Sequence, residues 1–171
     1  MVRIKFRVWF ASCVGAMSLF ADSAHAADIG GMISSTLTIT EDSQLVDDVT
    51  CAVTGSPCIA IAAPNVTLEL NGFTMTGQAD PQIACNGAGT GSEIGIDVNA
   101  QIGVDIRGPG LVKQFRGFGI RLLNSTRSSL TGVTTSTNCF SGIFVTGGSD
   151  HTLERNIAVR NGNSSNPCGG I

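Results

Sequence analysis

A Gly-Ile dipeptide recurs through the second half of the chain at a nearly constant period. It starts at residues 95, 119, 142 and 170, so that successive copies are 24, 23 and 28 residues apart. Each of the first three isoleucines is followed, ten residues later, by one further aliphatic residue. These residues are Ile106, Leu130 and Leu153. Self-similarity at a period of about two dozen residues is typical of a solenoid, whose repeats bury their apolar faces only by stacking on one another.

Apolar and polar residues alternate around these anchors. Ile96 and Val98 flank Asp97, and the same period of two continues over residues 102–106 and 118–122. Side chains that alternate in this way point to opposite faces of a strand, so one column of Ile, Val and Leu is expected to fill an interior. Glycine and β-branched residues are common while helix-favouring Glu, Lys and Gln are scarce, which predicts an all-β protein.

The second anchor follows the first at a constant distance, whereas the connection to the next repeat varies in length. This pattern favours a right-handed parallel β-helix, a solenoid of about four to five coils, with loops that leave the coil at residues 78–93 and 162–168. An antiparallel sandwich or jelly roll is the alternative. It also suits short strands and frequent turns. It does not explain why ten residues always separate the two anchors of a repeat while the connection to the next repeat varies in length.

The first 26 residues have the three-part pattern of a secretory signal peptide. Arg3, Lys5 and Arg7 form a basic start, an apolar run covers residues 8–20, and Ala24-His25-Ala26 supplies small residues for a cleavage site. The apolar run is shorter than the roughly 20 residues that span a membrane. We therefore expect cleavage after Ala26 and a secreted, periplasmic or cell-surface protein without a membrane span.

After this cleavage, residues 27–60 are expected to form an N-terminal lead or cap, and residues 61–171 the β-helix repeats. The remaining chain carries 7 basic and 12 acidic residues, because three of the 10 basic and one of the 13 acidic residues precede residue 27. It has no basic patch interleaved with aromatic residues, which argues against nucleic acid as a partner.

Five cysteines follow the predicted cleavage site, and export would permit disulfides between them. Cys51 and Cys58 enclose a short loop and are expected to pair. Cys139 and Cys168 precede consecutive Gly-Ile anchors by four and three residues, which favours a second disulfide and leaves Cys85 as the odd thiol. No Cys-x-x-Cys spacing occurs and one histidine remains, so neither a metal site nor another cofactor is expected.

Two segments carry a resemblance to a known superfamily. Residues 65–73 (NVTLELNGF) resemble the opening coil of pectin-lyase-like right-handed β-helix proteins, and residues 149–156 (SDHTLERN) resemble the parallel β-helix repeat of that superfamily. The resemblance covers about residues 50–171 and implies the fold rather than an activity. The superfamily includes lyases, hydrolases, epimerases, copper-delivery factors and adhesins.

Polysaccharide hydrolases and lyases of this superfamily use clustered carboxylates, and no such cluster is evident in the sequence. The only Asp-Asp pair, Asp47-Asp48, precedes the predicted repeats. The remaining catalytic candidates are Asp150, His151 and Arg155, because an Asp-His couple can orient an imidazole for general-base chemistry. The alternative is a turn in which Asp150 bonds its own backbone.

Alignment of the repeats gives the other charged residues a structural role. Equivalent positions on consecutive coils lie about 4.8 Å apart. This spacing would place side chains of opposite charge next to each other and would stack two asparagines at a turn, where their amides can bond along the axis. The predicted charge pairs are Glu69 with Arg107, Asp97 with Arg121, and Arg127 with Asp150, and the predicted asparagine ladder is Asn138 with Asn161.

Two functions follow from these patterns. The first is a structural or binding module of the cell envelope that contacts polysaccharide or an envelope protein and has no complete active site. The alternative is the N-terminal part of a polysaccharide lyase or hydrolase whose catalytic coils lie beyond residue 171. The chain ends in Gly169-Gly170-Ile171, at the start of a coil. We therefore also expect an uncapped C-terminal end that is open to self-association.

Overall fold

A computed structural model describes residues 26–79 and 90–162. These residues contain no α-helix. The described part of the chain therefore has no helix that could cross a membrane. The strands are β1 (Ala27–Ile33), β2 (Leu37–Ile39), β3 (Ser43–Cys51), β4 (Ile59–Ile61), β5 (Thr67–Glu69), β6 (Thr74–Thr76), β7 (Ile96–Asn99), β8 (Asp105–Lys113), β9 (Ile120–Leu123), β10 (Ser129–Ser136), β11 (Ile143–Thr146), β12 (Thr152–Glu154) and β13 (Ile157–Val159), and a 3-10 turn, η2 (Thr90–Ser92), precedes β7.

Several predicted features lie outside the described residues. They are the signal segment before Ala26, most of the 78–93 loop with Cys85, and the C-terminal segment with Cys168, the last Gly-Ile pair and the expected uncapped end.

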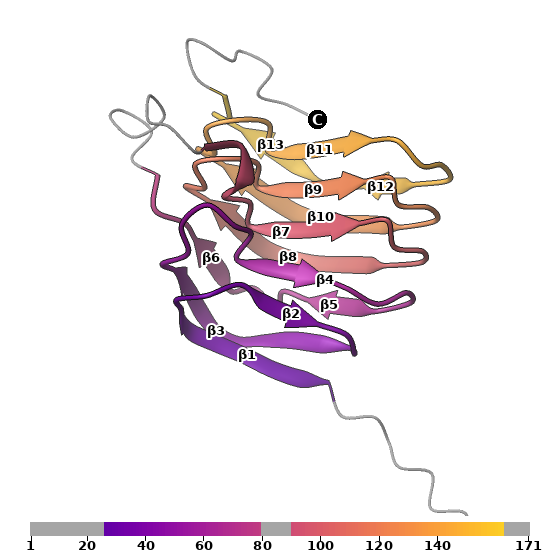
Figure 1. The fold of residues 1–171 in the computed structure, drawn as a ribbon, viewed down its shortest axis with the longest axis horizontal. Coiled ribbons are helices and arrows are strands. Elements are labelled where there is room, and N and C mark those ends of the chain that lie inside the picture. Colours follow the sequence, from indigo (N-terminus) through magenta and orange to yellow (C-terminus); the bar gives the residue numbers. More distant parts are fainter. Residues whose placement is uncertain (1–25, 80–89, 163–171) are drawn as a thin grey trace, which may run out of the picture.

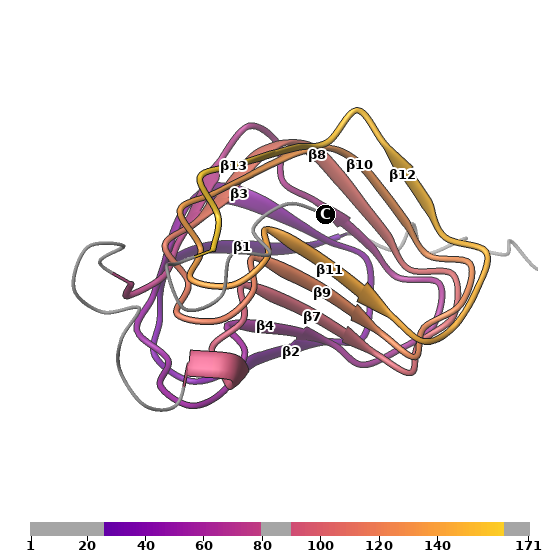
Figure 2. The ribbon, with the colours of Figure 1, turned by 90° about the horizontal axis from the view of Figure 1, so that it is seen from above.

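The strands form two parallel sheets (Figures 1 and 2). Sheet A has the order β1-β3-β5-β8-β10-β12, with β6 and β13 extending its rows, and sheet B has the order β11-β9-β7-β4-β2. The chain alternates between the two sheets and advances by one strand position at each return. Every strand pair within residues 26–79 and 90–162 is parallel, which excludes the antiparallel alternative for these strands and is compatible with a parallel β-helix.

The predicted anchors are paired across the sheets. In sheet A, Leu68 pairs with Ile106, Ile106 with Leu130, and Leu130 with Leu153. In sheet B, the isoleucines of the three described Gly-Ile pairs form one continuous row. Except for Leu153, which is partly buried, these anchor side chains are fully buried. The repeat therefore consists of two aliphatic columns that face each other across the interior.

The segment predicted as an N-terminal lead supplies further strands of the same sheets. Leu37 pairs with Ile59 and Ile59 with Ile96, while β1 and β3 extend sheet A in parallel. The sheets thus extend further toward the N-terminus than the Gly-Ile repeat indicated. Repeat alignment missed these strands because Leu37 and Ile59 lack the preceding glycine, and because the 78–93 loop separates Ile59 from Ile96 in sequence.

The predicted asparagine ladder is confirmed, and it explains the glycines that precede the isoleucines. The Asn138 Oδ1 accepts a hydrogen bond from the Phe115 amide (3.0 Å), and its Nδ2 donates to the Val112 carbonyl (3.2 Å) and to Asn161 Oδ1 (2.9 Å). A Cβ on Gly119 would lie 2.6 Å from the Gly142 carbonyl oxygen and 2.7 Å from the Asn138 amide nitrogen. Only glycine fits at this position, because the backbone passes directly over the ladder.

The predicted Cys51–Cys58 disulfide is present. It closes a short loop between β3 of sheet A and β4 of sheet B. Cys139 is also disulfide-bonded. Its predicted partner, Cys168, lies outside the described residues, so that pairing stays a prediction.

We predict that Asn138→Ala lowers the free energy of unfolding by about 3 kcal/mol, because it leaves a buried amide and a buried carbonyl without partners. Urea denaturation of the two proteins measures the change. The exposed Asn99→Ala is the matched control and should change stability by less than about 0.5 kcal/mol. Equal effects of the two substitutions would contradict the structural role of the ladder.

Candidate functional site

The structure does not join Asp150, His151 and Arg155 into a catalytic group. Asp150 lies in the turn before β12 with a φ of 61°, and its Oδ2 accepts a hydrogen bond from the Ser149 hydroxyl at 2.8 Å. Within residues 26–79 and 90–162, neither ring nitrogen of His151 has a hydrogen-bond partner. Arg155 is exposed and joins none of the ion pairs among the described residues. Among the described residues, no carboxylate is hydrogen-bonded to this imidazole.

His151 lies in the turn region beside Ser128, because Thr152 pairs with Ser129 and the Thr152 amide donates to the Ser128 carbonyl at 3.0 Å. The hydroxyls of Ser125 and Ser128 are buried and, like the imidazole, have no hydrogen-bond partner in the part of the chain that the structure describes. Burial of these polar groups costs free energy that no hydrogen bond offsets among the described residues. No hydrogen bond links them into a nucleophile–base pair.

The first predicted charge pair is confirmed on the outer face of sheet A. The Arg107 Nη1 lies 3.0 Å from Glu69 Oε1, and the same guanidinium contacts Asp105 on its own strand. Asp105 also accepts a hydrogen bond from the Ser129 hydroxyl on the next strand. Hydrogen bonds to Asp105 and then Glu69 raise the pKa of Arg107 above its usual value. Both carboxylates are therefore held in an ion-pair ladder.

The second predicted pair is confirmed and is less exposed. The Arg121 Nε donates to Asp97 Oδ1 at 2.7 Å, and its Nη2 donates to Asp97 Oδ2 at 2.9 Å. The Asp97 side chain is 10% exposed and the Arg121 side chain 22%. Two parallel bonds between planar groups are the strongest form of this interaction.

The third predicted pair, Arg127 with Asp150, is wrong. The two residues do lie close in the stack, because the Arg127 amide donates to the Ser149 carbonyl at 2.9 Å. Both have left-handed backbone conformations, with φ of 53° and 61°, and the Asp150 carboxylate bonds Ser149 instead. In a strand, side chains alternate between the two faces, but this alternation does not hold in a left-handed turn. The direction of the two side chains could therefore not be deduced from the alignment of the repeats.

A further ion pair was not predicted. Arg116 contacts the buried Glu93 carboxylate through Nε and Nη2, and Glu93 Oε1 also accepts a hydrogen bond from the Gly55 amide at 3.0 Å. Arg116 additionally bonds Gln78. The separation of 23 residues between Glu93 and Arg116 equals the repeat period, so an alignment that included the connections would have found the pair. This ion pair and its hydrogen bonds link the β3–β4, β6–β7 and β8–β9 connections.

The Asp47-Asp48 pair also has a structural role. Asp48 Oδ1 accepts a hydrogen bond from the Thr74 amide at 2.8 Å, and Asp42 Oδ1 accepts one from the Thr67 amide at 2.7 Å. These carboxylates bond backbone donors of the neighbouring strand, where the sheet bends and its own ladder is interrupted. They do not converge on a common point with a third acid.

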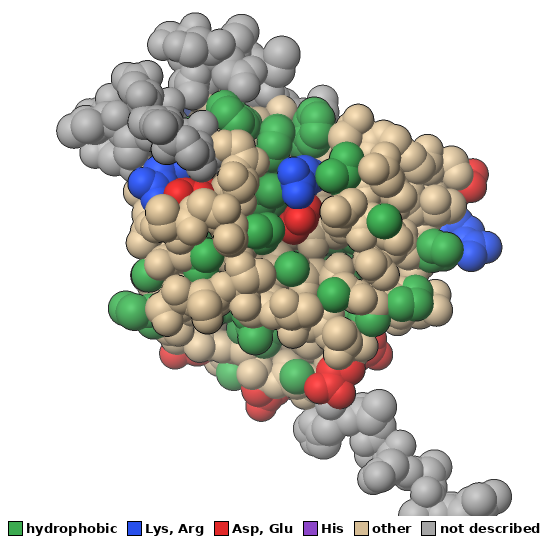
Figure 3. Space-filling view, in the orientation of Figure 1, with side chains coloured by type: hydrophobic (Ala, Val, Ile, Leu, Met, Phe, Trp, Pro, Cys, Tyr) green, Lys and Arg blue, Asp and Glu red, His purple; other side chains and the backbone are tan. Residues whose placement is uncertain are grey.

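The outer face of sheet B combines the Asp97–Arg121 pair with aromatic rings. Figure 3 shows basic and acidic side chains beside hydrophobic ones on the side of the molecule that faces the viewer in Figure 1. Arg121 pairs in register with Phe144 on the next strand. The Phe144 ring stacks on Phe118, with centroids 4.5 Å apart and an interplanar angle of 19°, and Phe140 meets Phe118 edge-on at 5.3 Å. All three rings are partly exposed. We name these five residues the aromatic face; sequence analysis did not single it out, although the phenylalanines flank successive Gly-Ile pairs.

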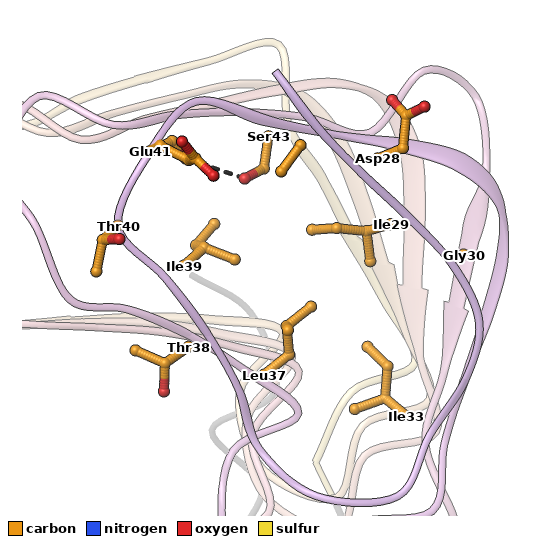
Figure 4. A pocket seen from close by; sticks show the side chains of 11 residues that line it. Asp28, Ile29, Gly30, Ile33, Leu37, Thr38, Ile39, Thr40, Glu41 and Ser43 are labelled. Carbon is orange, nitrogen blue, oxygen red and sulfur yellow. Dashed lines mark hydrogen bonds between the residues drawn. The ribbon is translucent and has the colours of Figure 1, made fainter. Parts of the chain in front are cut away.

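The N-terminal end of the stack contains a cavity of about 420 Å³. Ile29, Ile33, Leu37 and Ile39 project into it from β1 and β2, as Figure 4 shows. Asp28 of β1 also lines it, as do Thr40 and Glu41 of the β2–β3 connection. We name it the N-terminal cavity. It is the open apolar interior of the first strands, with no convergent set of acids or bases.

Among the residues that the structure describes, no three His, Cys, Asp or Glu side chains are grouped so that they could hold a metal ion. Comparison with known protein families, curated proteins and solved structures finds no match.

We predict that Arg121→Leu lowers the free energy of unfolding by about 3 kcal/mol, because it leaves the buried Asp97 carboxylate unpaired. The double substitution Asp97→Leu/Arg121→Leu should recover all but about 1 kcal/mol, since it removes both charges. Arg107→Leu, at an exposed pair, should cost no more than about 1 kcal/mol. Urea denaturation tests the order, and a double variant less stable than Arg121→Leu would contradict it.

Proposed function

We propose that the chain is an exported right-handed parallel β-helix of the pectin-lyase-like superfamily and acts as a carbohydrate-binding module of the cell envelope. The handedness follows from the general rule that parallel strands joined by crossovers in one sheet connect right-handedly in about 98% of cases. The NVTLELNGF and SDHTLERN segments support the superfamily. The Cys51–Cys58 disulfide and the signal-type N-terminus support an oxidising compartment outside the cytoplasm.

The aromatic face is the observation that carries the binding function. A phenylalanine ring presents a flat apolar surface on which the C–H face of a sugar ring can lie. Arg121 uses two of its donor nitrogens on Asp97, and its remaining N–H groups are available to hydroxyl oxygens. Aromatic surface beside fixed polar donors is the usual composition of a small-molecule binding surface. Because Asp97 neutralises Arg121, we expect neutral saccharides to bind in preference to acidic ones.

The positions of the acids favour binding over catalysis within the described residues. Glu69, Glu93, Asp97 and Asp105 are each committed to an arginine. Glycoside hydrolysis needs two carboxylates that flank one bond, and β-helix lyases need acids that share a cation. These four acids are each held by an arginine instead.

Titration calorimetry with a panel of neutral and acidic oligosaccharides tests the proposal. Phe144→Ala should weaken binding of the best neutral ligand at least about tenfold, the effect of one well-placed aromatic contact. The exposed Ile102→Ala, away from the aromatic face, should leave the affinity unchanged. Absence of binding to every member of the panel, or equal losses in both variants, would contradict the proposed function.

A further inference from the structure

The guanidinium of Arg121 has one edge bonded to Asp97 and a second edge that is free. Its Nε and Nη2 donate to the two carboxylate oxygens, at 2.7 and 2.9 Å. A guanidinium carries five N–H groups, so this pairing leaves one N–H on Nη2 and both on Nη1. No hydrogen bond within residues 26–79 and 90–162 uses them. One of the Nη1 groups is parallel to the remaining Nη2 group, and together they form the free edge.

Two kinds of saccharide group fit this free edge. Two parallel N–H donors bind two acceptor oxygens that lie side by side. Neighbouring hydroxyl groups of a neutral sugar offer such a pair of oxygens, and so does the carboxylate of a uronic acid. Hydrogen-bond geometry therefore does not distinguish neutral from acidic saccharides at this edge, and an arginine without a carboxylate partner would favour the acidic group through its charge.

The charge of this surface is decided by the Asp97–Arg121 pair. Outward side chains form a row in register across the five strands of sheet B, and its members are Thr38, Ala60, Asp97, Arg121 and Phe144. The row beside it contains Asn99, Leu123 and Thr146. Apart from the pair, these residues of both rows are uncharged. The balance between one carboxylate and one guanidinium therefore determines how the aromatic face receives a charged ligand.

The carboxylate of Asp97 opposes an acidic ligand at this edge. Its side chain is 10% exposed, so solvent screens its charge only in part. An acidic group bound to the free edge would face Asp97 across the width of one guanidinium. Like charges that face each other in a binding site are strongly unfavourable. Two neighbouring hydroxyl groups bring no charge to the same edge and avoid this repulsion.

From this geometry we infer that the free edge of Arg121 binds a pair of neighbouring hydroxyl groups on a neutral sugar, and that Asp97 is the specificity-determining residue that keeps a carboxylate out of the same position. Removal of the Asp97 charge, with its shape retained, should therefore convert the aromatic face into one that accepts acidic saccharides. The inference rests on the proposed carbohydrate-binding function. It adds to that function the chemical group that is recognised and the residue that sets the class of saccharide.

Deoxy analogues of the best neutral ligand test the hydroxyl pair with the wild-type protein. Each analogue lacks one hydroxyl group, and calorimetric titration compares its affinity with that of the parent sugar. A site that hydrogen-bonds a hydroxyl group rejects the analogue that lacks it, so removal of either of two neighbouring hydroxyl groups should weaken binding at least about tenfold. Losses that fall on no two neighbouring positions would overturn the inference.

Asp97→Asn tests the role of the charge, because it removes one negative charge and nearly preserves the shape of the side chain. Titration compares a neutral oligosaccharide with a uronic-acid oligosaccharide of the same length. The variant should bind the acidic ligand at least about tenfold more tightly than the wild-type protein does. Salt well above about 0.1 M, where the screening length falls below about 10 Å, should reduce this gain. The gain should be lost in Asp97→Asn/Phe144→Ala, which removes the ring beside Arg121.

Asp105→Asn is the matched control. It changes the net charge by the same amount at another arginine-paired aspartate, on sheet A, and leaves Arg107 paired with Glu69. It should leave both affinities unchanged, and circular dichroism establishes that each variant is folded. If the wild-type protein binds neutral saccharides but Asp97→Asn gains no more affinity for the acidic ligand than the control, the inference is overturned and the proposed function stands. If none of the proteins binds any saccharide, both are overturned.

Discussion

In-register stacking of two aliphatic columns is the constraint on which the rest of this structure depends. A turn of the chain with strands of three to nine residues encloses too little apolar surface to form a core. Burial of an Ile or Leu side chain contributes roughly 1.5–3 kcal/mol. Ile96, Ile120 and Ile143 gain this contribution only because neighbouring strands cover them above and below. Each strand therefore stabilises the next, and an error of one residue in register would turn every column outward.

The same constraint determines where polar groups can lie. A fixed register brings equivalent positions next to each other, so an acid on one strand meets an arginine on the next and an asparagine amide meets its neighbour. These interactions satisfy charges and backbone groups inside the stack. Among the described strands, the large exposed apolar side chains Met32, Val46, Ile157 and Val159 lie on β1, β3 and β13, toward the two ends of sheet A. The aromatic face differs, because it lies on the side of the stack and remains available to a ligand.

Sequence reasoning succeeded where strand geometry is regular. The constant ten-residue distance between the two anchors of a repeat predicted that Leu68, Ile106 and Leu130 pair across neighbouring strands. The same alignment correctly predicted two of three ion pairs. It failed where the chain leaves the strand conformation: the Arg127–Asp150 pair lies in a left-handed turn, and Glu93–Arg116 joins connections that were not aligned. It also gave no strand positions for β2 and β4, because these strands have no Gly-Ile signal. The phenylalanines flank successive Gly-Ile pairs at offsets that differ from one repeat to the next, so repeat alignment did not predict their contacts.

The pairing of the aliphatic columns can be measured directly by NMR on a sample with labelled isoleucine and leucine methyl groups. The account predicts nuclear Overhauser contacts from Ile120 to both Ile96 and Ile143, and from Ile106 to both Leu68 and Leu130, with strands parallel. Contacts that pair Ile120 with any other strand position, or antiparallel contacts between these segments, would contradict it.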